Sequence, residues 1–217
     1  MEFKCFVGRD REIRHIEQAI TGGVNAILSG RFGIGRTSLA RQIATRLAGR
    51  HPFVFLDGQH TPALLCRQIL AALDPRPDGP VSYKAGRALL RQLVQSADPP
   101  AVFVLDNMSG LSAPKIEFLR LLAWGRHNRF ILIVESFLPS SDLTRLRSMF
   151  TPVTEIRLGY LSRRSAKEFF RRHAAAHRFG WSEADIDARS QAAGGYPLNM
   201  CASVEMELNR RASPPHS

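Results

Sequence analysis

Apolar and polar positions follow two patterns along the first 160 residues of the chain. In one, apolar residues recur every three or four positions, as at Ile13, Ile16 and Ile20, which predicts helices with one buried face. In the other, short apolar runs predict strands buried on both faces of a sheet, at residues 24–29, 53–57, 101–107 and 129–136. Residues 153–158 alternate, which predicts a fifth strand at a sheet edge. Strands that alternate with helices indicate an α/β fold with a mainly parallel sheet between layers of helices.

The pattern changes at residue 161, after which only helices are predicted. They are expected at residues 166–177, from about 181–183 onward, and at residues 198–211. The last five residues, rich in serine and proline, are expected to be disordered. The chain is therefore divided into an α/β core at residues 1–160, a small all-helical unit at residues 161–212 and a tail at residues 213–217.

A glycine-rich loop follows the first predicted strand and precedes a predicted helix. Its sequence matches the phosphate-loop pattern G-x-x-x-x-G-K-[ST] at every fixed position except one, where Arg36 replaces lysine. The glycines allow backbone N–H groups to point at phosphate oxygens, and the helix N-terminus adds partial positive charge. Thr37 would place its hydroxyl on Mg²⁺ between the β- and γ-phosphates. The predicted phosphate-binding residues are Gly30, Gly33, Ile34, Gly35, Arg36, Thr37 and Ser38.

Two other interpretations of this loop are open. It could be a glycine-rich turn without a ligand, or the start of a dinucleotide-binding fingerprint that uses Gly33, Gly35 and the later Asp57. The fingerprint requires a third small residue, a place that Ser38 fills only loosely, and it does not explain Gly30 or Thr37. The strand, loop and helix context therefore favours a nucleoside-triphosphate loop.

A second landmark is the apolar run that ends in Asp106 and Asn107. A strand buried on both faces would deliver Asp106 to the carboxyl edge of the sheet, where ligands of open α/β sheets lie. A carboxylate there can hold Mg²⁺ directly or through water. The alternative is that Asp106 begins a turn or caps the following segment. The upstream loop favours the magnesium role.

Composition adds two predictions. The 217 residues carry a net charge of +11, almost all of it from arginine, since lysine occurs only four times. Both a solvated basic surface and contact with nucleic acid remain open interpretations of this charge. No apolar run is long enough for a membrane span and no signal peptide is visible, so no membrane contact is expected. The three cysteines lie in no metal or redox spacing, which indicates a reduced cytoplasmic setting.

Four motifs occur in an order that resembles the AAA+ and STAND P-loop ATPases, in particular the branch near archaeal Orc1/Cdc6 initiators and transposition ATPases. They are Phe6-Val7-Gly8-Arg9, the phosphate loop, Leu105-Asp106-Asn107 and Gly194-Gly195-Tyr196-Pro197. The resemblance extends over residues 6–211, and residues 158–162 look like the entry to the family's helical lid. It implies a P-loop NTPase fold with a five-stranded sheet followed by that lid, and ATP or ADP with Mg²⁺ as cofactors.

The resemblance also implies roles for single residues. Val7, Gly8 and Arg9 would lie near the adenine, and Pro197 would close over the base. Asp106 would be the Walker B aspartate, with Asn107 at the place of the acid that polarises the attacking water. Ser136 matches the sensor 1 position. Either Arg145 or Arg147 could act on the nucleotide of a neighbouring subunit in a homo-oligomer with nucleotide-bridged interfaces.

Three positions depart from the family pattern, namely Arg36, Asn107 and Phe137, which stands where many STAND proteins carry arginine. A guanidinium is not equivalent to an ammonium at a crowded phosphate site, and an amide cannot accept a proton from water. A nucleotide-dependent switch with weak or slow ATP hydrolysis is therefore expected. Two alternatives stay open: a DNA-associated ATPase of transposition or replication, and a non-hydrolysing scaffold or adaptor for an unknown protein partner.

Overall fold

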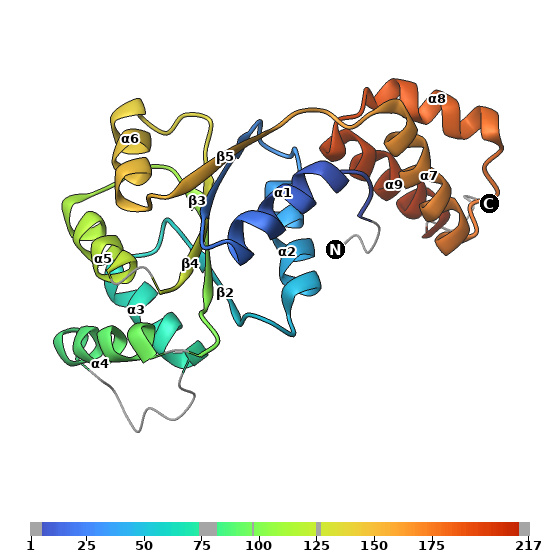
Figure 1. Cartoon of the computed structure of the whole chain (residues 1–217). Coiled ribbons are helices and arrows are strands. Elements are labelled where there is room, and N and C mark those ends of the chain that lie inside the picture. Colours follow the sequence, from blue (N-terminus) through green and yellow to red (C-terminus); the bar gives the residue numbers. More distant parts are fainter. Residues whose placement is uncertain (1–5, 74–81, 97, 125–126, 213–217) are drawn as a thin grey trace.

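The structure is a computed structural model that describes residues 6–73, 82–96, 98–124 and 127–212. The predicted disordered tail and Cys5 lie outside these residues. The described part contains a single five-stranded sheet, helices on both of its faces, and a separate helical unit at the C-terminal end (Figure 1).

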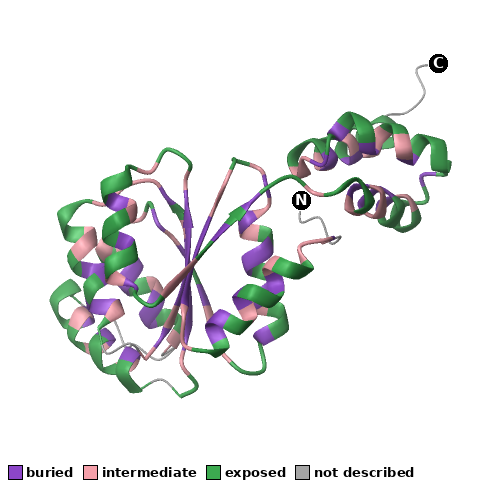
Figure 2. Cartoon of the chain, turned by 45° about the horizontal axis from the view of Figure 1, so that its top comes forward, coloured by how far each residue is buried: buried purple, intermediate pink, exposed green. Residues whose placement is uncertain are grey.

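The sheet has the strand order β2-β3-β4-β1-β5, and every pair of neighbouring strands is parallel. Its strands are β1 (Asn25–Gly30), β2 (Phe53–Asp57), β3 (Val102–Met108), β4 (Arg129–Val134) and β5 (Val153–Leu158). The prediction of an α/β fold with a five-stranded parallel sheet is confirmed, as is the edge position of β5. The prediction that residues 53–57 are buried on both faces is wrong, because β2 is the other edge strand and Phe55 is exposed on its uncovered side. The central strands carry the most continuous apolar runs because both of their faces are buried (Figure 2).

Two helical layers cover the sheet. On one face lie α1 (Asp10–Thr21) and α2 (Arg36–Leu47), whose isoleucines and leucines pack on Leu28, Val104 and Ile133. The other face is covered by α3 (Pro62–Leu73), α4 (Tyr83–Ser96), α5 (Ala113–Ala123) and α6 (Ser140–Met149). Successive side chains of a strand point to opposite faces, so each central strand contributes to both apolar cores.

The C-terminal unit, called the lid below, consists of α7 (Arg163–His177), α8 (Glu183–Ala193) and α9 (Pro197–Ala212). It has an apolar core of its own, which includes Phe169, Phe170 and Met200. Val7 belongs to this core although it lies at the start of the chain. The segment before α1 therefore connects the lid to the α/β core. None of the described helices is long and apolar enough to cross a bilayer.

Candidate functional site

The phosphate-loop sequence forms the turn between β1 and α2, at the carboxyl end of β1, which lies between β4 and the edge strand β5. Gly33 and Gly35 adopt φ angles of +71° and +93°, which residues with a Cβ rarely adopt. Gly35 is the N-cap of α2, and no side chain caps the helix there. The first turn of α2 also contains no acidic residue, so its free N–H groups and positive dipole end are available to an anion.

Thr37 and Asp106, both predicted to bind one metal ion, meet at this edge. The Thr37 hydroxyl donates a hydrogen bond of 2.7 Å to Asp106 Oδ2. Strand β4 lies between β1 and β3, so the first turn of α2 must pass over the end of β4 for this contact to form. A hydroxyl and a carboxylate are hard oxygen donors that suit Mg²⁺. Among the described residues no three His, Cys, Asp or Glu side chains cluster as a metal site.

Arg36 is nearly buried, with 7% of its side chain exposed, and it does not extend into open space. Its Nη2 donates to both carboxylate oxygens of Glu135, at 2.8 and 2.9 Å, and its Nη1 donates to the carbonyl of Val134. Sequence reasoning missed Glu135. A buried arginine requires a counter-charge, and this glutamate directly after a buried strand was the available signal.

Asn107 and Ser136, the other two predicted catalytic residues, are both exposed. Asn107 has a φ angle of +56°, and its backbone N–H donates to Asp106 Oδ1 at 2.8 Å. Asparagine tolerates this left-handed conformation better than most residues do. The occurrence of asparagine at position 107 can therefore be explained by the backbone conformation as well as by a role in catalysis. Ser136 comes one residue after Glu135 at the end of β4.

The lid is fastened to the loop by polar contacts that the sequence did not predict. Tyr196, before α9, donates a hydrogen bond from its hydroxyl to the carbonyl of Phe32. Arg31 lies 5.6 Å from the centre of the Tyr196 ring and donates at 2.8 Å to the hydroxyl of Tyr160, in the connection from β5 to the lid. Leu198, in the first turn of α9, packs so closely that a Cβ on Gly33 would lie 2.8 Å from the Cβ of Leu198. The lid thus contacts the phosphate loop directly, next to Pro197 at the start of α9.

The three residues predicted to lie near adenine are all at the junction of core and lid. Arg9 donates to the carbonyl of Gly159 at 2.6 Å and to that of Ile34 at 3.3 Å. A Cβ on Gly8 would lie 2.8 Å from Ser165 Oγ in α7. Val7 and Gly8 also line a pocket of about 760 Å³ between α1, α2 and α7. Its other walls are mostly polar and include Gln42, Arg46, Arg164, Ser165, Glu168, Arg171 and Arg172.

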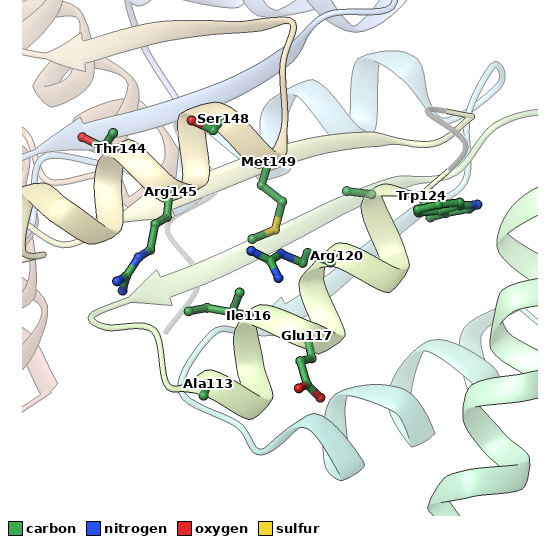
Figure 3. A pocket seen from close by; sticks show the side chains of 10 residues that line it. Ala113, Ile116, Glu117, Arg120, Trp124, Thr144, Arg145, Ser148 and Met149 are labelled. Atoms are coloured by element: carbon green, nitrogen blue, oxygen red, sulfur yellow. The ribbon is translucent and has the colours of Figure 1, made fainter.

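The two arginines proposed to act in trans differ in their surroundings. Arg147 lies against Glu155 of β5, with Nη2 at 2.8 Å from Oε2, and this contact lowers the pKa of Glu155. Arg145 makes one ion pair with Asp142, at 3.1 Å, and 57% of its side chain is exposed. It lines a groove of about 750 Å³ between α5 and α6, together with Arg120, Trp124 and Met149 (Figure 3). Arg145 is therefore the less constrained of the two.

The sequence matches a known protein family, and the fold matches solved structures. The model of the AAA domain family matches residues 21–140. Cdc6p from Pyrobaculum aerophilum has a similar structure, with a TM-score of 0.75 over 96% of this chain at 15% identity. The Aeropyrum pernix Orc1 protein, solved in complex with DNA, gives 0.63 over 98% at 16% identity, and the Thermotoga maritima RuvB Holliday junction branch migration motor gives 0.61 over 92% at 17% identity.

The chain spans only part of these proteins: 65% of Cdc6p, 70% of Orc1 and 61% of RuvB. At such low identity the likeness concerns the fold. Among curated proteins no sequence matches this chain.

Proposed function

Because this chain belongs to the AAA domain family of P-loop ATPases, we propose that it binds an adenine nucleotide with Mg²⁺ and acts as a nucleotide-dependent switch. The observation that carries the proposal is the 2.7 Å contact between Thr37 and Asp106 above the phosphate loop. It brings together, from segments 69 residues apart, the two oxygen donors that a Mg²⁺-nucleotide requires. Bound Mg²⁺ would supply charge neutralisation for the β- and γ-phosphates.

Each part of the site has a distinct task in this proposal. The backbone N–H groups of residues 33–38 and the N-terminus of α2 hold the phosphates. Val7, Gly8 and Arg9 lie near the base, at the junction of core and lid, and Pro197 closes over it. The lid responds to nucleotide because Tyr196 binds the carbonyl of Phe32 inside the loop. A change in loop conformation on binding would therefore be transmitted to the residue that precedes α9.

Hydrolysis is proposed to be slow. Arg36 stands where the family has lysine, and its planar guanidinium, which in this structure binds Glu135 and Val134, is not equivalent to a compact ammonium at the phosphates. The amide of Asn107 can orient a water molecule but cannot accept its proton. The switch would thus remain in its ATP-bound state for long periods. If the hydrolysis rate were zero, the protein would be a non-hydrolysing scaffold or adaptor. Self-association through nucleotide-bridged interfaces, with Arg145 or Arg147 acting in trans, stays a prediction, and so does the cytoplasmic location.

ATP with Mg²⁺ is expected to raise the melting temperature, because a ligand that binds only the folded state stabilises it. At 100 times the dissociation constant the gain in unfolding free energy is about 2.7 kcal/mol. The measurement is thermal unfolding with and without millimolar ATP and Mg²⁺. Thr37→Val should lose most of this gain, whereas Thr45→Val, which removes an exposed hydroxyl from the same helix, should keep it. An unchanged melting temperature for the unmodified protein would contradict nucleotide binding.

A second candidate function is contact with DNA, as in a DNA-associated ATPase. The observation in its favour is an arginine-rich face around an exposed tryptophan. Trp124 is 70% exposed and lines both the groove between α5 and α6 and an adjoining pocket of about 250 Å³ between α4 and α5. Arginines from three helices line the same groove and pocket, namely Arg87, Arg91, Arg120 and Arg145, and Glu117 is an acidic residue that lines both. Exposed aromatic rings among arginines suit single-stranded nucleic acid, where bases stack and phosphates pair with guanidinium groups.

Trp124→Ala is expected to weaken the binding of a single-stranded oligonucleotide by about tenfold, since stacking contributes about 1–3 kcal/mol per base. Affinity of the unmodified protein should also fall steeply as salt rises, through counterion release. Fluorescence anisotropy at low and moderate salt measures both effects. Phe137→Ala removes an equally exposed ring from the end of β4 and serves as the control. Absence of binding at low salt would exclude this function.

A further inference from the structure

The pair formed by Arg36 and Glu135 occupies the centre of the candidate site. Strand β4, which ends at Val134, lies between β1, which leads into the phosphate loop, and β3, which carries Asp106. Glu135 is thus placed between the phosphate-binding and metal-binding halves of the site. Its side chain is 10% exposed and that of Arg36 is 7% exposed, so water screens the pair weakly.

The Arg36 guanidinium is bound to the end of β4. One terminal nitrogen serves both oxygens of Glu135, and the other serves the carbonyl of Val134. Hydrogen bonds between a guanidinium and a carboxylate are among the strongest in proteins, because both partners are charged. In this conformation the charge of Arg36 is neutralised by Glu135, and its guanidinium is not available to a phosphate group in the loop.

A triphosphate in the loop would change the balance around Arg36. The negative phosphate oxygens attract the Arg36 guanidinium, which has a limited number of N–H donors to share among its acceptors. The same oxygens repel the negatively charged carboxylate of Glu135. Two arrangements then compete: Arg36 bound to Glu135, or Arg36 bound to phosphate. Nucleotide affinity depends on the free energy needed to break the first arrangement, and binding releases the carboxylate of Glu135.

We propose that Glu135 determines nucleotide affinity, by holding Arg36 in an ion pair that the phosphates must displace. This inference rests on the proposed nucleotide site. It differs from a purely structural role, in which the pair would stay intact in the nucleotide-bound protein. Arg36 and Glu135 act together in this proposal. Arg36 binds Glu135 when the loop is empty and binds phosphate when nucleotide is present, and the strength of the ion pair with Glu135 sets the nucleotide concentration at which this exchange occurs.

Glu135→Gln tests the proposal, because glutamine keeps the size and an acceptor oxygen while it removes the competing charge. Titration of the full chain with ATP and Mg²⁺ by calorimetry is expected to show about tenfold tighter binding than in the unmodified protein, since a hydrogen bond to a charged group contributes more than a neutral one. Glu155→Gln removes the same charge from an exposed glutamate–arginine pair on β5 and should leave the affinity unchanged.

A second variant separates displacement of Arg36 from simple repulsion by the carboxylate. In Arg36→Met/Glu135→Gln the gain should disappear, because no guanidinium is left to be released to the phosphates. A gain that persists in this double variant would overturn the proposal in favour of simple repulsion. Unchanged or weaker binding by Glu135→Gln, with the unmodified protein binding ATP, would overturn the proposal and leave the nucleotide site standing. If neither protein binds ATP, both the inference and the proposed function are wrong.

Discussion

Replacing Asn107 by glutamate is expected to raise the rate of ATP hydrolysis by about 10²-fold, because a carboxylate at this position can accept a proton from the attacking water. Residue 107 directly follows Asp106, whose carboxylate contacts Thr37 at the predicted metal site. General-base assistance is typically worth about 10²–10⁴-fold. Phosphate release at saturating ATP and Mg²⁺ measures the effect.

The gain is placed at the low end of that range for a structural reason. Residue 107 has a φ angle of +56°, and a glutamate held there costs roughly 1–2 kcal/mol of backbone strain. Asn107→Gln is the matched control, because glutamine has the length of glutamate and meets the same strain but has no carboxylate. The carboxylate interpretation requires acceleration by glutamate alone. Equal rates for the glutamate and glutamine variants, or turnover of several per second by the unmodified protein, would contradict it.

The larger features of the fold could be predicted from the sequence because they depend on local patterns. Continuous apolar runs predicted β1, β3 and β4 as inner strands and the alternation of residues 153–158 predicted β5 as an edge strand, which agrees with the order β2-β3-β4-β1-β5. The same reasoning was wrong for β2, because its apolar run belongs to the other edge strand, which leaves Phe55 exposed. The convergence of Thr37 with Asp106 was also predictable. Thr37 follows β1 and Asp106 lies near the end of β3, and the carboxyl ends of strands in one parallel sheet meet at one edge.

The partners of these residues were not predictable from local patterns. Arg36 looked like a substituted lysine when it was considered alone, whereas in the structure it is one half of a pair with Glu135, 99 residues away. The lid contacts of Arg31 and Tyr196 depend on side-chain positions that no spacing encodes. The left-handed conformation of Asn107 likewise became visible only with the backbone. The partners of a substituted residue and its backbone conformation decide whether the substitution removes an activity or whether neighbouring residues compensate for it.

Gly195, the second glycine of the Gly194-Gly195-Tyr196-Pro197 motif, packs against the backbone of Leu161, and its substitution tests how the lid is attached. Gly195 has a φ angle of +73°, and a Cβ there would collide with the carbonyl oxygen of Leu161. The backbones also meet at this point, since the N–H of Leu161 donates to the carbonyl of Gly195 at 2.8 Å. Leu161 lies in the connection from β5 to α7, so this contact joins the entry of the lid to the start of α9.

Gly195→Ala is expected to lower the unfolding free energy by about 2–5 kcal/mol, as overpacking costs about 1–3 kcal/mol and the left-handed backbone costs roughly 1–2 kcal/mol more. Gly194→Ala is the matched control, because Gly194 has a φ angle of +58° but no atom within 4 Å of the place that a methyl group would take. It should lose only the backbone part. Urea unfolding measures both variants. Equal losses would show that φ alone decides and that the contact with Leu161 yields easily. A larger loss at Gly195, together with faster hydrogen exchange in α7 and α9, would locate the weakened contact at the attachment of the lid, next to the tyrosine that reaches the phosphate loop.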